Sequence, residues 1–222
     1  MIIDLTANDE TVERCFMFDA RLRPLIDPLL NTVGQKLAAA RVTANQATLA
    51  GLAIGVAAGG LISQRCYAAG LCLLLISRLL DGLDGAIARA TAKTDFGGYL
   101  DIVCDFAFYT AIPVGFGAAV AANTLAALVL VASFTLTGIS FLAYAVLAEK
   151  HGQHTVAHGE KSFFYNTGIA EGTETILAFT LMCLWPQHFS PIAYMYTFLC
   201  LLTVMQRSWL ARRHFDSSAL SR

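Results

Sequence analysis

The feature that most constrains this chain is a run of 43 consecutive residues, 106 to 148, without any Asp, Glu, Lys or Arg. A helix needs about 20 apolar residues to cross the hydrocarbon core of a bilayer, so this run is long enough for two spans and a turn. Residues 42–64 and 175–206 form two further runs of this kind. Only 14% of the residues are charged, whereas soluble domains carry about a quarter. The sequence therefore indicates an integral membrane protein.

We predict an all-α, polytopic membrane protein that forms a single domain over residues 1–222. An amphipathic helix at about 20–40, where apolar and polar positions are mixed, is expected to lie on the membrane surface. Six transmembrane helices should follow it, with a turn near residues 121–123. The predicted spans are approximately 43–64, 66–90, 97–120, 124–148, 163–185 and 191–209.

The distribution of basic residues predicts the orientation. Thirteen of the 15 Lys and Arg residues lie in the N-terminal segment, the 89–96 turn, the 149–162 loop and the C-terminal segment. Basic residues concentrate on the cytoplasmic side of membrane proteins, so both termini are expected there, in a bacterial inner (plasma) membrane. The net charge of −1 provides no basic field for binding nucleic acid, so no nucleic-acid partner is expected.

Four carboxylates stand where the second and third predicted spans meet. Asp81 and Asp84 are three residues apart, and Asp101 and Asp105 are four apart, so each pair shares one face of its helix. A short connection makes the two helices antiparallel, which allows the four acids to converge. Acids that face one another in a low dielectric are either partly protonated or separated by cations. Oxygen ligands suit Mg²⁺ or Mn²⁺, and paired ions are common in phosphoryl chemistry.

The residues alone leave two classes of function open. One is a metal-dependent enzyme, and the alternative is a membrane cation transporter or channel that uses its intramembrane carboxylates. Acids inside spans are typical of ion pathways, and Glu171 with Glu174 would form a proton relay in that interpretation. The position of the four acids at one edge of the membrane, with no second set at its centre, favours the enzyme.

The spacing of the acids resembles the signature of the CDP-alcohol phosphatidyltransferases, which are integral-membrane enzymes of phospholipid synthesis. The signature reads Asp81-x2-Asp84-Gly85-x2-Ala88-Arg89-x7-Gly97-x3-Asp101-x3-Asp105, and every fixed residue is present. The predicted spans and surface helix extend the resemblance over most of the chain. The segment 41–48 also resembles the one that opens the family's first span, with Ala44 where the family often has Pro.

This resemblance implies a transferase that moves a phosphatidyl group from a CDP-linked lipid, usually CDP-diacylglycerol, to the hydroxyl of a small alcohol and releases CMP. Two divalent cations, Mg²⁺ or Mn²⁺, would be held by Asp81, Asp84, Asp101 and Asp105. Asp105 would also be the catalytic base that takes the proton from the acceptor. The CDP site would be lined by Gly85, Ala88, Arg89 and Gly97. Family members are commonly homodimers that are embedded in membrane lipids, so we expect the same of this chain.

Residues outside the signature are candidates for binding the acceptor. Glu171 and Glu174 are three apart, and they either contact acceptor hydroxyls or a cationic group or lie at a wet helix end. Arg78 either holds a phosphate or balances the acids, and balance is the favoured interpretation. Lys161 either meets an acceptor phosphate or anchors the chain at the membrane surface. The sequence does not identify the acceptor, although the Glu pair favours an uncharged or cationic one.

Overall fold

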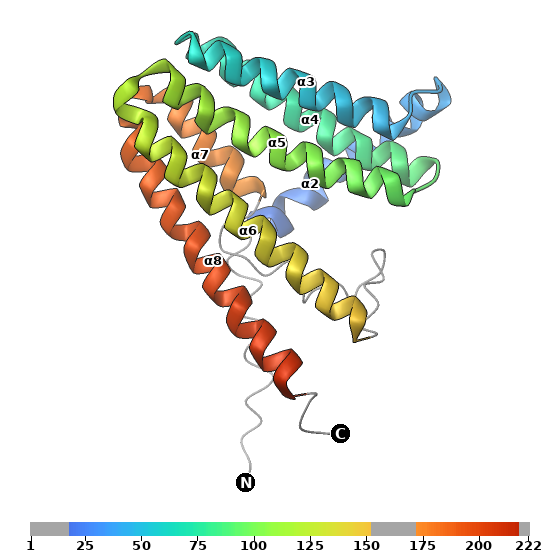
Figure 1. The fold of residues 1–222 in the computed structure, drawn as a ribbon. Helices are drawn as coiled ribbons and strands as arrows, with labels where there is room; N and C mark the ends of the chain where they lie inside the picture. Colours follow the sequence, from blue (N-terminus) through green and yellow to red (C-terminus); the bar gives the residue numbers. More distant parts are fainter. Residues whose placement is uncertain (1–17, 152–171, 218–222) are drawn as a thin grey trace.

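The computed structural model describes residues 18–151 and 172–217, and all regular elements in these ranges are helical, as predicted. Two short 3₁₀ turns, η1 (Ala121–Asn123) and η3 (Pro186–His188), join successive helices at the two breaks that the sequence predicts. The helices are α2 (Phe18–Ala39), α3 (Ala44–Ser63), α4 (Tyr67–Ala90), α5 (Asp95–Ala119), α6 (Thr124–Lys150), α7 (Gly172–Leu184) and α8 (Phe189–Ser217) (Figure 1).

Four of the described helices are long and apolar enough to cross a membrane, namely α3, α5, α6 and α8. Helix α4 has 24 residues, but its second half carries Arg78, Asp81, Asp84 and Arg89. Helix α7 is apolar and has 13 described residues. The predicted fifth span starts at residue 163, and its first part, 163–171, lies outside the described residues.

Local side-chain chemistry sets the helix ends. Thr43 and Gln46 form a reciprocal capping box at the start of α3, and Thr94 accepts a hydrogen bond from the backbone N–H of Gly97 at the start of α5. Helix α5 therefore begins at Asp95, two residues before the predicted span. The predicted span 191–209 lies within α8, which continues to Ser217. Hydropathy marks where a helix leaves the apolar layer, whereas the helix itself can continue in water.

Helices α3, α4 and α5 run side by side, and α6 packs against both α5 and α8 (Figure 1). Two glycines allow a close crossing of α3 and α5: a Cβ at Gly59 would lie 2.6 Å from the carbonyl oxygen of Ala111, and one at Gly115 would collide with the backbone of Gly59. Apolar surface gives helices little reason to associate within lipid, so tight packing at small residues is an important source of their association.

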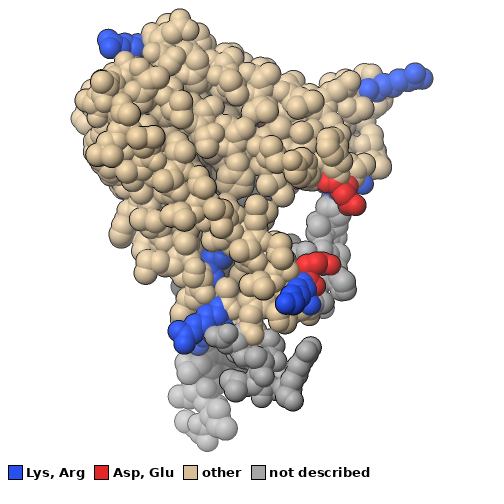
Figure 2. Space-filling model, in the orientation of Figure 1, with Lys and Arg blue, Asp and Glu red and all other residues tan. Residues whose placement is uncertain are grey.

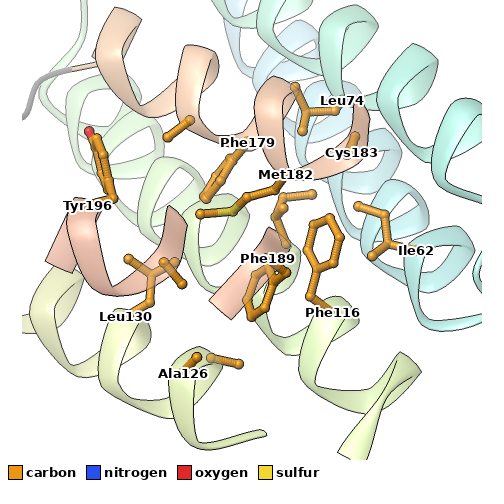
Figure 3. Close-up of a cluster of buried hydrophobic side chains, with 14 of the residues drawn as sticks. Ile62, Leu74, Phe116, Ala126, Leu130, Phe179, Met182, Cys183, Phe189 and Tyr196 are labelled. Carbon is orange, nitrogen blue, oxygen red and sulfur yellow. The ribbon is translucent and has the colours of Figure 1, made fainter. Parts of the chain in front are cut away.

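An aromatic core connects helices α3, α4 and α5 to α6, α7 and α8 (Figure 3). The rings of Phe116 and Phe189 stack with centroids 4.5 Å apart, and Phe179 is fully buried beside Met182. The outer surface is largely apolar too, with large side chains such as Leu125, Val146 and Met205 exposed. Figure 2 shows a broad uncharged face, with the Lys, Arg, Asp and Glu side chains at its margins. Such a surface suits lipid.

Candidate active site

Three of the four signature acids gather between α4 and α5. Asp81, Asp84 and Asp101 each offer a carboxylate oxygen, and these atoms lie within 4.8 Å of one another. Asp84 is 6% exposed, whereas Asp101 is open to the surface. Hard carboxylate oxygens at such separations are the ligands that Mg²⁺ and Mn²⁺ prefer. The residues present therefore fit a divalent cation at this place.

A hydroxyl from α3 supports this group. Thr48 Oγ1 donates a hydrogen bond of 2.6 Å to Asp84 Oδ2, and both side chains are buried. Hydrogen bonds to a charged acceptor are short and about twice as strong as neutral ones. Thr48 therefore holds Asp84 in one orientation and leaves its other oxygen for a ligand.

Asp105 has a different partner. Its Oδ1 accepts a hydrogen bond of 2.7 Å from Nη1 of Arg78, and the same nitrogen lies 3.5 Å from Asp81 Oδ1. The Arg78 side chain is only 9% exposed, and its guanidinium carbon lies 3.7 Å from the centroid of the Phe108 ring. Four carboxylates thus stand at this site, three together and one paired with a buried cation.

A cavity of about 1080 Å³ opens beside the acids. It lies between the α2–α3 connection, the start of α3, the end of α4 and the start of α5. Asp84 and Asp101 reach its wall, as do the basic residues Arg41 and Lys93. Asp81 and Asp105 are not among the lining residues. Asp95 lines the cavity as well. The cavity wall thus combines two acids of the cluster with basic side chains, a combination that suits a phosphorylated ligand beside a metal ion.

Three of the four residues expected to line a CDP site do line the cavity, and the fourth does not. Gly85, Ala88 and Gly97 line the cavity, and a Cβ at neighbouring Gly98 would meet nothing within 4 Å. Arg89 is not among the lining residues. Its Nε and Nη2 lie 3.2 and 3.0 Å from Asn31 Oδ1, so it contacts α2.

The candidate acceptor residues are also placed in part. Glu174 lies in the first turn of α7, and its Oε2 is buried without a hydrogen-bond partner in the described part of the chain. The next residue, Thr175, shares a 2.7 Å hydrogen bond with Tyr196. Glu171 and Lys161 lie outside the described residues.

No role was predicted from the sequence for Thr48 or Asn45, although both line the cavity. Their spacing could have indicated a common role, because polar residues three apart in a charge-free run share one face of a helix. The pairing of Asp105 with Arg78 was harder to predict from the sequence. Arg78 and Asp81 are one helical turn apart, and this spacing favours a contact between them rather than one between Arg78 and α5.

Comparison with known proteins now decides the family. The sequence profile of the CDP-alcohol phosphatidyltransferases matches residues 41–206, which include the four acids, helices α3 to α7 and every cavity-lining residue except Ala38. This chain belongs to the CDP-alcohol phosphatidyltransferase family. The match confirms the resemblance carried by the 81–105 signature, and it places the acid cluster in a member of a phospholipid-synthesising transferase family.

Two curated relatives span nearly the whole chain. Inner membrane protein YnjF of Escherichia coli is 46% identical over 194 residues, which are 87% of this chain and 94% of the relative. The archaetidylinositol phosphate synthase of Pyrococcus horikoshii is 31% identical over 205 residues, 89% of this chain and 98% of that protein.

Solved structures share the fold. The phosphatidylinositol phosphate synthase of Mycobacterium tuberculosis with CDP-DAG bound superposes with a TM-score of 0.62 at 20% identity, covering 83% of this chain and 94% of that one. The same enzyme in complex with manganese and citrate gives a TM-score of 0.60 at 20% identity, with coverage of 82% and 88%.

Proposed function

We propose that this phosphatidyltransferase uses CDP-diacylglycerol as donor and transfers its phosphatidyl group to a small alcohol. The observation that supports this most is the cavity whose wall includes Asp84 and Asp101 together with Arg41 and Lys93. A diphosphate placed there would be near both the acids with their cations and the basic side chains of the wall. The CDP-DAG-bound relative of the same fold supports the choice of donor.

We further propose that two divalent cations are held by the four signature acids, Asp81, Asp84, Asp101 and Asp105. When bound, Mg²⁺ or Mn²⁺ would neutralise the negative charge that grows on the diphosphate as CMP leaves. The manganese-containing relative supports this assignment. Gly85, Ala88 and Gly97 would let the nucleotide approach the backbone closely, and Arg89 would close the site near α2.

In the proposed reaction, Asp105 takes the proton from the acceptor hydroxyl. The acceptor oxygen forms a bond to the phosphorus that carries the diacylglycerol, the bond from that phosphorus to CMP breaks, and CMP departs. The products are a phosphodiester lipid and CMP. A general base must lie within hydrogen-bond reach of its proton, so the acceptor is expected on the Asp105 side of the cluster.

We propose an uncharged or cationic alcohol as the acceptor. Arg78, the cation nearest the base, is already paired with Asp105. Arg207 donates to Thr137 O and Ser140 Oγ. Glu174 Oε2, which is buried and has no hydrogen-bond partner among residues 18–151 and 172–217, suits a hydroxyl or an ammonium group. Glu171 and Lys161 remain predictions as acceptor contacts.

The proposed setting is a bacterial inner membrane. Helices α4 and α7 would complete six spans with α3, α5, α6 and α8, while α2 lies on the cytoplasmic surface. Both termini and the cavity would face the cytoplasm, where CMP and the acceptor are soluble, and the acyl chains would stay in lipid. Two copies are proposed to associate as a homodimer within the membrane.

A comparison of two substitutions tests this function. Purified protein with Mg²⁺, CDP-diacylglycerol and a panel of alcohols should release CMP. Asp105→Asn should lower the rate at least about 100-fold because the base is lost. Asp27→Asn makes the same chemical change on α2, outside the acid cluster and the cavity, and should retain the rate. Equal rates in the two variants would contradict the role of Asp105, and cation flux in liposomes without CMP release would favour a transporter.

A further inference from the structure

We propose that Arg78 is a positioning residue that aims the carboxylate of Asp105 at the acceptor. This inference rests on the proposed function, in which Asp105 is the base. Arg78 Nη1 lies 2.7 Å from Asp105 Oδ1, while Asp81, Asp84 and Asp101 share their own group. The fourth acid, Asp105, thus has its own partner, and Arg78 Nη1 lies between it and Asp81 of the other three.

Arg78 is itself held in place by its surroundings. Its guanidinium carbon lies 3.7 Å from the ring centroid of Phe108, which is fully buried. Cations over an aromatic face are stabilised by the ring quadrupole, and more so when water is excluded. Arg78 Nη2 lies 3.4 Å from Ser77 Oγ, which donates a 2.7 Å hydrogen bond to the carbonyl oxygen of Gly51. Contacts with α5 and, through Ser77, with α3 thus limit the guanidinium to one orientation.

A fixed guanidinium has a specific consequence for Asp105. Oδ1 accepts the hydrogen bond from Arg78, and Oδ2 has no hydrogen-bond partner among the described residues. Arg78 therefore fixes one oxygen, and the other is left for the roles proposed for Asp105, as a cation ligand and as the base. The positive charge of Arg78 also offsets the repulsion between Asp105 and the neighbouring acids, including Asp81, whose Oδ1 lies 3.5 Å from Nη1 of Arg78. Both effects act on the base and neither requires Arg78 to touch a substrate.

Arg78 has two other possible roles, and they make different kinetic predictions. A residue that binds the acceptor or the donor phosphate would mainly change KM when it is replaced. A residue that only stabilises the fold would lower stability and metal binding together. A positioning residue should lower kcat at nearly constant KM, because misaiming a base by about 1 Å can cost on the order of 100-fold.

The test compares Arg78→Gln and Arg78→Lys in the purified full chain. Arg65→Gln is the control, since it removes a positive charge beyond the opposite end of α4. We expect Arg78→Gln to lower kcat by about 10- to 100-fold, with the KM of donor and acceptor within about threefold. Arg78→Lys keeps the charge but has no planar fork, so its kcat should fall about 3- to 10-fold. Arg65→Gln should match the wild type.

Binding of Mn²⁺, measured by electron paramagnetic resonance without substrates, separates positioning from a structural role. Arg78→Gln removes a cation next to Asp81, so Mn²⁺ should bind at least as tightly as in the wild type. The proposal would be overturned by an unchanged kcat in Arg78→Gln or by a rise in KM alone. It would also be overturned if both variants lost Mn²⁺ binding and folding together. If only Arg78→Gln fails to fold, the kcat of Arg78→Lys decides, and a wild-type value overturns it. Failure of the proposed function is distinct, because the wild-type protein itself would then release no CMP.

Discussion

The hydroxyl of Thr48 lies 2.6 Å from Oδ2 of Asp84, so a residue of α3 orients an acid of α4 inside the candidate metal site. Thr48→Val keeps the shape and removes the donor, which leaves a buried carboxylate oxygen unpaired. Hydrogen bonds to charged groups contribute about 1.5–3 kcal/mol, so we expect Mn²⁺ affinity and CMP release to fall about 10- to 100-fold. Thr48→Ser retains the hydroxyl and should stay within about threefold of the wild type. Equal losses in both variants would contradict an orienting role for the hydroxyl.

Removal of divalent cations gives a second prediction. Dialysis against EDTA should abolish CMP release, because no cation at Asp81, Asp84 and Asp101 would then neutralise the charge that grows on the diphosphate as CMP leaves. Added Mg²⁺ or Mn²⁺ should restore the rate. Asp84→Asn should also weaken Mn²⁺ binding, measured by electron paramagnetic resonance. Full activity after exhaustive chelation would show that the acid cluster works without a metal.

Gly55 on α3 provides a test of the helix packing around Arg78. A Cβ there would lie 2.5 Å from Phe108 Cδ2 and 2.9 Å from Ser77 Oγ, two side chains that contact Arg78. Gly55→Ala should therefore destabilise the protein by about 1–3 kcal/mol and lower kcat. Gly60→Ala is the matched control in the same helix, because its Cβ would meet nothing within 4 Å. The thermal midpoint in detergent and the CMP release rate check both variants. A neutral Gly55→Ala would mean that α3 and α5 can separate without affecting the site.

The contact between Arg89 and Asn31 separates two roles of the signature arginine. If Arg89 serves the CDP site, Arg89→Gln should raise the KM for CDP-diacylglycerol about tenfold. Asn31→Ala removes only the exposed contact with α2, and the KM should stay within about threefold of the wild-type value. Equal increases in the two variants would show that Arg89 acts by docking α2 rather than through the nucleotide.

Much of the fold could be predicted from the sequence, because long runs without charge leave few options besides helices in lipid. Helix α6, for example, begins at Thr124 as predicted and ends two residues after the predicted boundary. Helix α8 extends beyond the predicted span 191–209, since Arg212, Arg213 and His214 stop a hydrophobic run but are compatible with a helix in water.

The site was predictable as far as helix periodicity carries information. Spacings of three and four place Asp81 with Asp84, and Asp101 with Asp105, on common faces, and the antiparallel hairpin brings the faces together. Periodicity does not determine side-chain orientation across helices. The pairing of Asp105 with Arg78 depends on Phe108 packing beneath the guanidinium, and the support of Asp84 by Thr48 depends on how closely α3 crosses α4.

The most direct test of the central claim is the mass balance of the reaction. Purified wild-type protein is incubated with CDP-diacylglycerol, Mg²⁺ and an isotope-labelled alcohol, and CMP and labelled lipid are quantified by mass spectrometry. The proposed function predicts equal molar amounts of CMP and a phosphodiester lipid that carries the label, both dependent on the alcohol and on Mg²⁺. Absence of labelled lipid with every alcohol tested, whether or not CMP appears, would contradict it.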